Sequence, residues 1–294
     1  MKPGHVRRLN SRAGEVWIPK AGWVRFRWSR AVPPARSYRV VRDRSGRWHV
    51  AFAVIPAAIP SPGTGEVVGV DRGVVVSAAL STGELLTVPG LSPGRRRRLI
   101  GLERKLARAT PGSGRRARVR LAVARLKARE ADGRKDWCEK LSTDLARRFD
   151  MIRVENLGIA RMTRSARGTV AEPGRNVRQK AGLNREIARS GWGLLVTRLE
   201  QKAPGRVQKV NAAYTSQRCS ACGYTAAGSR ESQSRFRCVA CNFACNADVN
   251  AAMNIAAGQA VKARGGDRVT GPAKREPQHA GPWSHSWNPR PPGR

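Results

Sequence analysis

The sequence is poor in acidic residues. Only 20 of its 294 residues are Asp or Glu, against 57 Lys and Arg, and the formal net charge is +37. A surface with so large an excess of positive charge repels itself unless polyanions neutralise it, which argues against an ordinary small-metabolite enzyme. The composition therefore favours nucleic acid as the partner.

Long apolar runs are also missing. No stretch approaches the roughly 20 apolar residues that a membrane-spanning helix needs. The two richest segments, residues 51–55 and 67–80, are short and are interrupted by Pro56 or by Asp71 and Arg72. The first ten residues contain no apolar core of a signal peptide. We therefore expect an intracellular protein that has no membrane partner.

In an intracellular protein the six cysteines are expected to be metal ligands or free thiols rather than disulfide partners. Four of them form two CxxC pairs, Cys219 with Cys222 and Cys238 with Cys241, and fifteen residues separate the pairs. This spacing is typical of a zinc ribbon, in which two tight turns supply four thiolates to one Zn²⁺. Four protein ligands leave no open position for chemistry, so the predicted zinc is structural, and Cys245 is interpreted as a spare thiol.

The first 65 residues alternate apolar and polar side chains over short stretches, as in residues 22–28, and predict a small β unit. Residues 38–41 and 48–54 predict a strand pair around a turn. Further strands are predicted in several apolar segments, at residues 67–80, 85–88, 151–155 and 207–213.

Residues 95–130 change character, because apolar residues recur there at helical spacing on both sides of a Pro-Gly-Ser-Gly turn. Two helices are predicted, followed by a third at 136–149 that carries Cys138 on its apolar stripe, and by helices around 192–199 and at 246–257. Residues 161–181 lack any period and predict a mobile loop.

The polar faces of the first two helices are crowded with arginine. The alternative is a merely solvated face, but like charges at helical spacing destabilise a helix, so contact with phosphates is the favoured interpretation. The arginines concerned are Arg95, Arg96, Arg97, Arg98, Arg115, Arg116, Arg118 and Arg120.

Three carboxylates stand out because the sequence has so few and because apolar residues surround them. Asp71 lies in the run VVGVDRG, Glu155 ends the strand MIRVE, and Asp248 opens a helix of small residues. An unpaired ionised carboxylate among apolar residues is costly unless a divalent cation neutralises several together. Two strand ends and one helix start can converge on a pair of Mg²⁺ or Mn²⁺ ions that hydrolyse phosphodiesters. The alternative is that each acid pairs with a neighbouring arginine, Arg72 or Arg153.

Four motifs occur in an order typical of one family: the string around Asp71, VENL at 154–157, YTSQRCSACG at 214–223 and NADVNAAMNI at 246–255. From about residue 15 to residue 257 the chain resembles the OrfB/TnpB proteins of insertion sequences, relatives of the type V CRISPR effectors. The last two motifs together are specific, because the zinc ribbon directly precedes the third acid.

The resemblance implies an α/β fold with an RNase H-like (RuvC) mixed sheet, an inserted Arg-rich helical hairpin, a zinc ribbon and an N-terminal β wedge remnant. It implies that Asp71, Glu155 and Asp248 are the acids of an RNA-guided DNA endonuclease, a family also described as transposases. The implied cofactors are structural Zn²⁺ and catalytic Mg²⁺ or Mn²⁺. The implied partners are DNA and a guide RNA from the transposon end. The implied location is the bacterial cytoplasm, in association with the nucleoid.

The resemblance also divides the chain into domains. Family members carry a longer N-terminal region with a recognition lobe, so we expect this chain to be a truncated copy or to have a misassigned start codon. The predicted domains are a partial wedge β-barrel (1–65), the RuvC nuclease domain (66–213) with a helical insertion (91–131), the zinc ribbon (214–245), the RuvC C-terminal helix (246–257) and a disordered basic tail (258–294).

Two other functions stay open from the sequence. A catalytically inactive remnant would use the ribbon and the basic helices only to hold nucleic acid, and a strand-transfer enzyme would use the same metals. The three carboxylates favour an enzyme over a pure binding protein, and the ribbon before the third acid favours an endonuclease over strand transfer. Arg218, in the YTSQRCSACG motif, is a further candidate for contact with phosphate.

Overall fold

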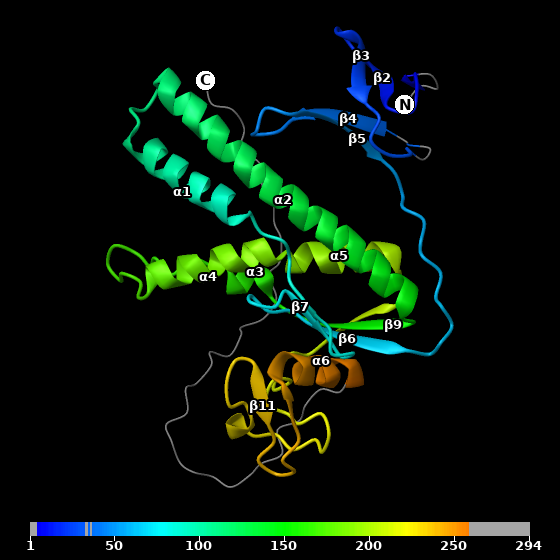
Figure 1. The fold of residues 1–294 in the computed structure, drawn as a ribbon, viewed down its shortest axis with the longest axis vertical. Coiled ribbons are helices and arrows are strands. Elements are labelled where there is room, and N and C mark those ends of the chain that lie inside the picture. The colour runs from blue at the N-terminus through cyan, green and yellow to red at the C-terminus, as the bar shows by residue number, and fades with distance from the viewer. Residues whose placement is uncertain (1–4, 33–34, 36, 259–294) are drawn as a thin grey trace, which may run out of the picture. The chain divides into compact units, whose positions relative to one another are not determined.

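The computed structural model describes residues 5–32, 35 and 37–258 of the chain (Figure 1). They all belong to the first of two compact units, Met1–Lys262, and the second unit, Ala263–Arg294, lies outside the described residues. The predicted basic tail (258–294) therefore also lies outside the described residues, apart from Gly258. Within the described part, no helix is long and apolar enough to cross a membrane.

A five-stranded mixed sheet forms the centre of the fold, with the strand order β10-β9-β6-β7-β8. Strands β6, β9 and β10 run parallel, whereas β7 is antiparallel to β6 and β8 is antiparallel to β7. The mixed sheet expected from the sequence is thus confirmed. Its strands are β6 (Val67–Asp71), β7 (Ala78–Leu80), β8 (Leu85–Leu86), β9 (Met151–Glu155) and β10 (Val207–Val210).

The helix pair α1 (Pro93–Arg108) and α2 (Gly114–Arg148) forms the predicted Arg-rich hairpin. The prediction of a separate third helix at 136–149 is wrong, because α2 continues through this region for 35 residues. The stretch contains no proline, and its one interior glycine, Gly133, costs only about 1 kcal/mol relative to alanine in a helix. The predicted insertion at 91–131 is therefore continuous with the helix that follows it.

The two halves of α2 bury their apolar side chains against different neighbours. Val123 and Leu126 pack with Leu99 of α1 in a small cluster. Leu145 joins the main core, together with Cys138, which confirms that this cysteine is a core residue. Burial raises the pKa of Cys138 to about 11, so its thiol stays neutral.

Three further helices follow β9: α3 (Ile159–Met162), α4 (Val177–Ser190) and α5 (Trp192–Lys202). The predicted loop at 161–181 is partly wrong, because α4 already begins at Val177. Asn184 of α4 donates from Nδ2 to the backbone oxygen of Thr163 at 2.8 Å. Such tertiary hydrogen bonds order a basic segment in which the sequence shows no period.

Helices cover both faces of the sheet (Figure 1). On one face, Val68 and Val70 of β6 share the core with Leu145 of α2 and Leu195 of α5. On the other face lies α6 (Ala247–Ala257), whose backbone approaches β6 closely. A Cβ atom on Gly69 would lie 2.0 Å from the backbone oxygen of Ala252 and 2.4 Å from the nitrogen of Ala256. The glycine and the small residues of α6 thus set the depth at which this helix sits.

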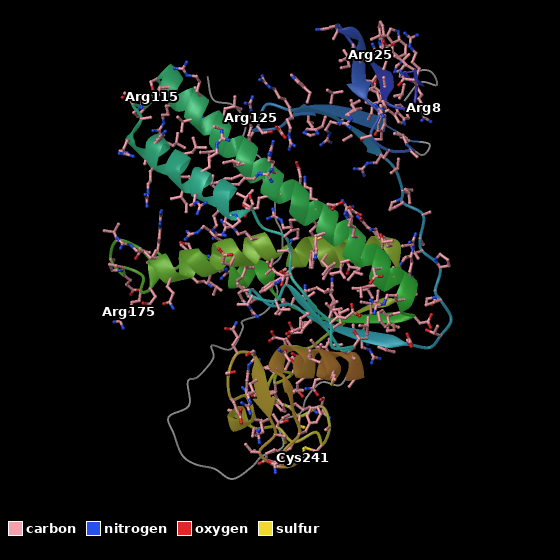
Figure 2. All side chains as sticks on the ribbon, viewed as in Figure 1. Arg8, Arg25, Arg115, Arg125, Arg175 and Cys241 are labelled. Atoms are coloured by element: carbon pink, nitrogen blue, oxygen red, sulfur yellow. The ribbon has the colours of Figure 1, made fainter. Side chains whose placement is uncertain are left out.

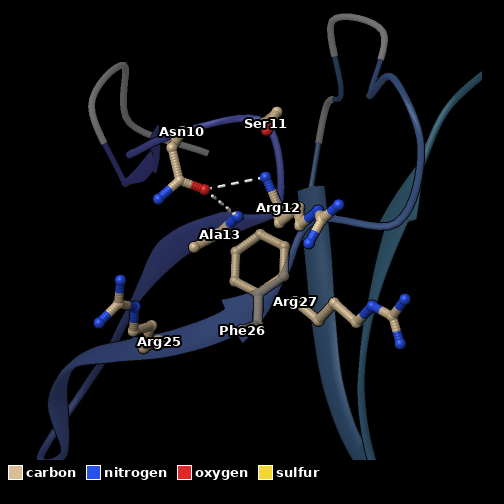
Figure 3. A pocket seen from close by; sticks show the side chains of 7 residues that line it. All are labelled: Asn10, Ser11, Arg12, Ala13, Arg25, Phe26 and Arg27. Atoms are coloured by element: carbon tan, nitrogen blue, oxygen red, sulfur yellow. Dashed lines mark hydrogen bonds between the residues drawn. The ribbon is translucent and has the colours of Figure 1, made fainter.

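The N-terminal region contains one three-stranded antiparallel sheet and one two-stranded hairpin in the described residues. Figure 3 shows how Asn10 turns the chain between the first two strands, with its Oδ1 accepting from the backbone nitrogens of Arg12 and Ala13 at 2.9 and 2.8 Å. Arg25 and Arg27 extend to either side of Phe26. The strands are β1 (Val6–Arg8), β2 (Ala13–Ile18), β3 (Gly22–Arg27), β4 (Ser37–Arg42) and β5 (Trp48–Ala53), of which β1 and β2 were not predicted.

The segment between β10 and α6 contains little helix or strand, as expected for a ribbon. It contains the 3-10 helix η1 (Ala227–Ser229) and a small antiparallel pair, β11 (Arg235–Arg237) with β12 (Ala244–Asn246). Strand β12 leads directly into α6, so the ribbon and this helix are covalently continuous.

We predict that Gly69→Ala destabilises the protein by about 2–4 kcal/mol, because α6 must move away from β6 to accommodate the methyl group. The matched control is Gly101→Ala in α1, where an added Cβ meets no atom within 4 Å. That change should stabilise the helix by up to about 1 kcal/mol. Denaturant unfolding measures both. Equal stability of the two variants would contradict the close approach of α6 to β6.

Candidate active site and metal centre

The three carboxylates singled out in the sequence line one cavity of about 220 Å³. Asp71 is the last residue of β6 and Glu155 is the last residue of β9. Because these strands are parallel neighbours with Val70 opposite Val154, both acids reach the same edge of the sheet. Asp248 comes from the first turn of α6, on the face of the sheet that these two side chains share. Residues 177 positions apart in the chain are therefore brought together.

The start of α6 at this cavity is fixed by a helix cap. The Asn246 side chain accepts hydrogen bonds from the backbone nitrogens of Asp248 and Val249, at 2.9 and 3.2 Å. This cap holds Asp248 in the first turn, where the helix dipole favours a negative charge. An asparagine directly before a helix is a recognisable capping signal, and the sequence analysis did not use it.

Burial and mutual repulsion act on the paired acids. Burial, followed by the charges of Glu155 and Asp248, raises the pKa of Asp71 to about 7. Burial also raises the pKa of Glu155, while the charge of Arg72 and hydrogen bonds with Asp71 and Thr215 act in the opposite direction. The cavity therefore holds more negative charge than its surroundings neutralise, which is the electrostatic environment that a divalent cation would stabilise.

The arginines proposed as alternative partners of these acids donate their hydrogen bonds to other groups. Arg153 donates to Gln208 Oε1 at 2.8 Å and to the backbone oxygen of Ala256. Arg72 donates to backbone oxygens. The ion pair formed within the described part of the cavity joins Arg230 of the ribbon to Asp248, with 3.3 Å between Nη2 and Oδ1. Arg230 and Thr215 also line the cavity. Thr215 lies in the YTSQRCSACG motif and Arg230 lies between the two CxxC pairs, but neither position indicates contact with the acids.

The four cysteines of the two CxxC pairs form the second cluster. Within the described residues, they are the one group of three or more candidate ligands whose donor atoms all lie within 4.8 Å of one another. The Sγ atoms of Cys219 and Cys241 are 3.7 Å apart, and those of Cys222 and Cys238 are 3.6 Å apart. Four sulfurs at this spacing can hold one tetrahedral metal ion. The oxygens of Asp71, Glu155 and Asp248 do not meet this criterion.

The two cysteine turns repeat the same backbone hydrogen bonds. Cys219 N donates to Tyr224 O and Cys238 N donates to Phe243 O, both at 2.8 Å. Four residues after each first cysteine the backbone turns back through a positive φ, 77° at Gly223 and 59° at Asn242. Glycine and asparagine are the residues that tolerate this conformation.

Two buried asparagines of α6 bind the first cysteine turn. Asn250 Nδ2 and Asn254 Nδ2 donate to the backbone oxygen of Arg218 at 2.7 and 2.8 Å. Asn250 Oδ1 accepts from the nitrogen of Ser220 at 3.0 Å, and Asn254 also donates to Thr215 O at 2.9 Å. The ribbon that carries Arg230 and the helix that carries Asp248 are thus joined by satisfied buried hydrogen bonds. Cys245 lies outside the sulfur cluster, as predicted.

The predicted phosphate-binding arginines lie on the α1–α2 hairpin, from which Arg115 and Arg125 project in Figure 2. Those at 95–98, 115, 118 and 120 are exposed. Arg116 has another role, because its Nη1 donates to the backbone oxygens of Leu106 and Ala109, at 2.9 and 2.7 Å. It therefore caps the end of α1. Arg218 is half-buried beside Gly223 in the first cysteine turn.

Comparison with known proteins gives two matching family models. The one described as "Probable transposase" (OrfB_IS605) matches residues 43–166. The one described as "Cas12f1-like, TNB domain" matches residues 192–255, which include the ribbon and most of α6.

Two full-length relatives align along most of the chain. "Putative RNA-guided DNA endonuclease InsQ" of Escherichia coli (strain K12) is 38% identical over 92% of this chain and 69% of that protein. A "Putative RNA-guided DNA endonuclease" of Streptomyces pristinaespiralis is 34% identical over 86% of this chain. The chain spans only 61% of that second relative. Among solved structures, a cryo-EM complex of Cas12f1 with guide RNA and target DNA matches at a TM-score of 0.39 and 20% identity, over 74% of this chain and 55% of the other.

We predict that Asp71→Asn stabilises the metal-free protein, because it removes one of the crowded buried charges. The pKa of Asp71 is raised from 3.8 to about 7, so folding of the wild type becomes less favourable as the pH rises between these values. The variant does not lose stability in this way as the pH rises. Its melting temperature should exceed that of the wild type by a few °C at pH 8 and by little at pH 4.5. The control is Asp136→Asn, an exposed acid on α2. A lower melting temperature at pH 8 would contradict the crowding of the acids.

We predict that Cys222→Ser loses the metal of the cysteine cluster, because one of four ligands is removed. Bound metal should fall from about one ion per chain to well below one, with a lower melting temperature. Cys245→Ser is the matched control and should keep both values. Elemental analysis of the purified proteins measures the metal, and equal content in the two variants would exclude the cluster as its site.

Proposed function

Because the chain belongs to the OrfB/TnpB family of insertion-sequence proteins, we propose that it is a divalent-metal-dependent DNA endonuclease whose active site contains Asp71, Glu155 and Asp248. The names of two relatives describe RNA-guided cleavage of DNA, and we assign the same substrate class to this chain. The observation that carries the proposal is the convergence of these three acids, remote in the sequence, on one cavity.

The strand order supports a RuvC-type nuclease domain with an RNase H-like sheet. Three consecutive strands, β6 to β8, are antiparallel neighbours, and β9 and β10 then add in parallel on the other side of β6. In a sheet of parallel strands, ligands bind outside the carboxyl ends of the strands. Asp71 and Glu155 are at the carboxyl ends of the two central strands.

The donor set fits Mg²⁺ or Mn²⁺, since these hard cations prefer carboxylate oxygens. Asp71 has both other acids as charged neighbours, so it would be shared between two ions, with Glu155 and Asp248 each completing one. When bound, such a pair of ions supplies a nucleophilic water and neutralises the leaving oxygen.

The chain's own residues would position the acids and the substrate. Thr215 lines the cavity together with Glu155, and its hydroxyl opposes the rise in the pKa of that carboxyl group. Arg230 lies beside Asp248 at the cavity, where its guanidinium can exchange this partner for a phosphate oxygen of the strand to be cut. In the reaction, a water oxygen forms the new bond to phosphorus and the bond to the 3′ oxygen breaks. The products are a 5′-phosphate and a 3′-hydroxyl.

We assign Zn²⁺ to the four cysteines in a structural role, because the cluster leaves no ligand position open. Its folding free energy would order the ribbon, which supplies Arg230 and binds α6 through Asn250 and Asn254. The zinc site would thus support the active site without taking part in the reaction.

The basic α1–α2 hairpin is proposed to hold nucleic-acid backbones, with a guide RNA and DNA as partners. Its exposed arginines form no ion pair with an acid of the described residues, so their charge is available to phosphates. Base pairing with the guide would select the DNA sequence, while the arginines bind without sequence preference. We also propose the domain boundaries expected from the sequence, including the wedge at 1–65.

The test is cleavage by the purified protein with Mg²⁺ or Mn²⁺, using single-stranded DNA and DNA paired to a guide RNA from the transposon end. Asp71→Asn and Glu155→Gln should each lower the cleavage rate by at least about 10²-fold, because even indirect supports of a metal site cost 10–100-fold. Asp136→Asn should cleave at the wild-type rate.

Because Asp71→Asn is expected to be the more stable protein, a loss of cleavage in this variant is not explained by unfolding. Equal cleavage by the wild type and Asp71→Asn would overturn the assignment of the site. Salt-sensitive binding without cleavage by the wild type would instead favour a nucleic-acid-binding remnant.

A further inference from the structure

A buried arginine directly follows the first acid. Arg72 is only 5% exposed, although it lies one residue beyond the end of β6. Successive side chains of an extended chain point to opposite faces. Asp71 therefore faces the cavity beside α6, while Arg72 faces the helix layer on the other side of the sheet. A charged side chain in such a place is costly unless it makes hydrogen bonds that the fold needs.

The guanidinium of Arg72 joins the ends of two other elements. Nη2 donates to the backbone oxygen of Glu155, the last residue of β9, and Nη1 donates to that of Trp192 at 3.4 Å. Trp192 is the first residue of α5, and its Nε1 donates in return to the backbone oxygen of Gly73 at 3.1 Å. The segment 71–73 is therefore held to β9 and α5 from both directions.

The charge of Arg72 is balanced by the acids whose strands it joins. Burial lowers the pKa of Arg72, and the charges of Glu155 and Asp71 oppose this effect. Its Nε atom has no hydrogen-bond partner in the described part of the chain. The residue thus depends on the two carboxylates electrostatically, while its hydrogen bonds go to the backbone and leave both carboxylates directed at the cavity.

We propose that Arg72 is a positioning residue, whose buried guanidinium joins the carboxyl ends of β6 and β9 and so fixes the spacing of Asp71 and Glu155 for divalent cations. The inference rests on the proposed function and adds a residue that never touches the metal or the DNA. Backbone bonds act here because the direct pairing of β6 with β9 ends at Val70 and Val154, one residue before each acid.

The opposite edge of the sheet offers a matched control. Arg206 precedes β10 and donates from Nη1 to the backbone oxygen of Phe149 at 2.8 Å. Its Nη2 donates to the oxygens of Ile59 and Ala146 at 2.8 and 3.1 Å. Arg206 is thus also a guanidinium that binds several backbone oxygens, at the amino ends of the strands and away from the acids. The same change, arginine to lysine, can therefore be made at both edges.

The experiment measures Mn²⁺ binding to the full chain, without nucleic acid, by electron paramagnetic resonance. Lysine keeps the charge but cannot reach two oxygens in the same fork. Arg72→Lys should raise the Kd for Mn²⁺ about tenfold, as loss of an indirect support of a metal site does. Arg206→Lys should lower the melting temperature but leave the Kd within about twofold. The Mn²⁺ binding that is lost in Asp71→Asn is the part that belongs to the proposed site.

Wild-type affinity for Mn²⁺ in Arg72→Lys would overturn the positioning role, even if that variant melts at a lower temperature. Equal Mn²⁺ binding by the wild type and Asp71→Asn would overturn the proposed metal site itself, which separates the two failures. Should Arg72→Lys fail to fold, Trp192→Phe removes the return bond to Gly73, together with part of a buried ring, and should still raise the Kd several-fold. An unchanged Kd in Trp192→Phe would then count against the inference.

Discussion

The crowding of three carboxylates in a small buried cavity is the constraint on which the rest of this structure depends. Folding brings Asp71, Glu155 and Asp248 together at a cost in free energy, which is visible in the raised pKa values of the first two. The surrounding fold must outweigh that cost without neutralising the site. It does so largely with backbone hydrogen bonds and close packing, since Arg230 alone pairs with one of these acids within the described residues. The cavity thus keeps a negative charge that a divalent cation would stabilise.

The third acid depends on the late part of the chain. Asp71 and Glu155 are fixed by adjacent parallel strands, but Asp248 requires α6 to lie flat on the sheet and to begin at the cavity. Gly69 permits the close contact, and Asn246 sets where the helix begins. The ribbon holds the same helix through Asn250, and it reaches the cavity through Arg230. The position of the four-cysteine cluster directly before the third acid therefore has a physical reason, since hydrogen bonds join the ribbon to the helix that completes the cavity.

The sequence predicted what has a periodic or fixed-spacing signal. The strands around Asp71 and Glu155, the helix of Asp248 and the two CxxC pairs are present, because apolar patterns and ligand spacing are local properties. The predictions of a separate helix at 136–149 and of a loop as far as residue 181 were wrong, and the contacts of Arg116 with the end of α1 were not predicted, for a common reason. Each depends on tertiary contacts that no local pattern reveals. Examples are the packing of the second half of α2 against the main core and the backbone oxygens at the end of α1 to which Arg116 donates. The ion pair between Arg230 and Asp248 was also not predicted, since only the folded ribbon brings the two side chains together.

The excess of positive charge has two uses, and only one of them concerns nucleic acid. Arg72, Arg116 and Arg206 bind backbone oxygens at the ends of strands and helices, where the regular hydrogen bonds of the fold run out. A guanidinium with five donors suits such places, because one side chain can satisfy several carbonyl groups. The net charge therefore overstates the charge that faces a polyanion. The exposed arginines of α1 and α2 face solvent without acidic partners, and they, rather than the total, determine how strongly this surface attracts phosphates.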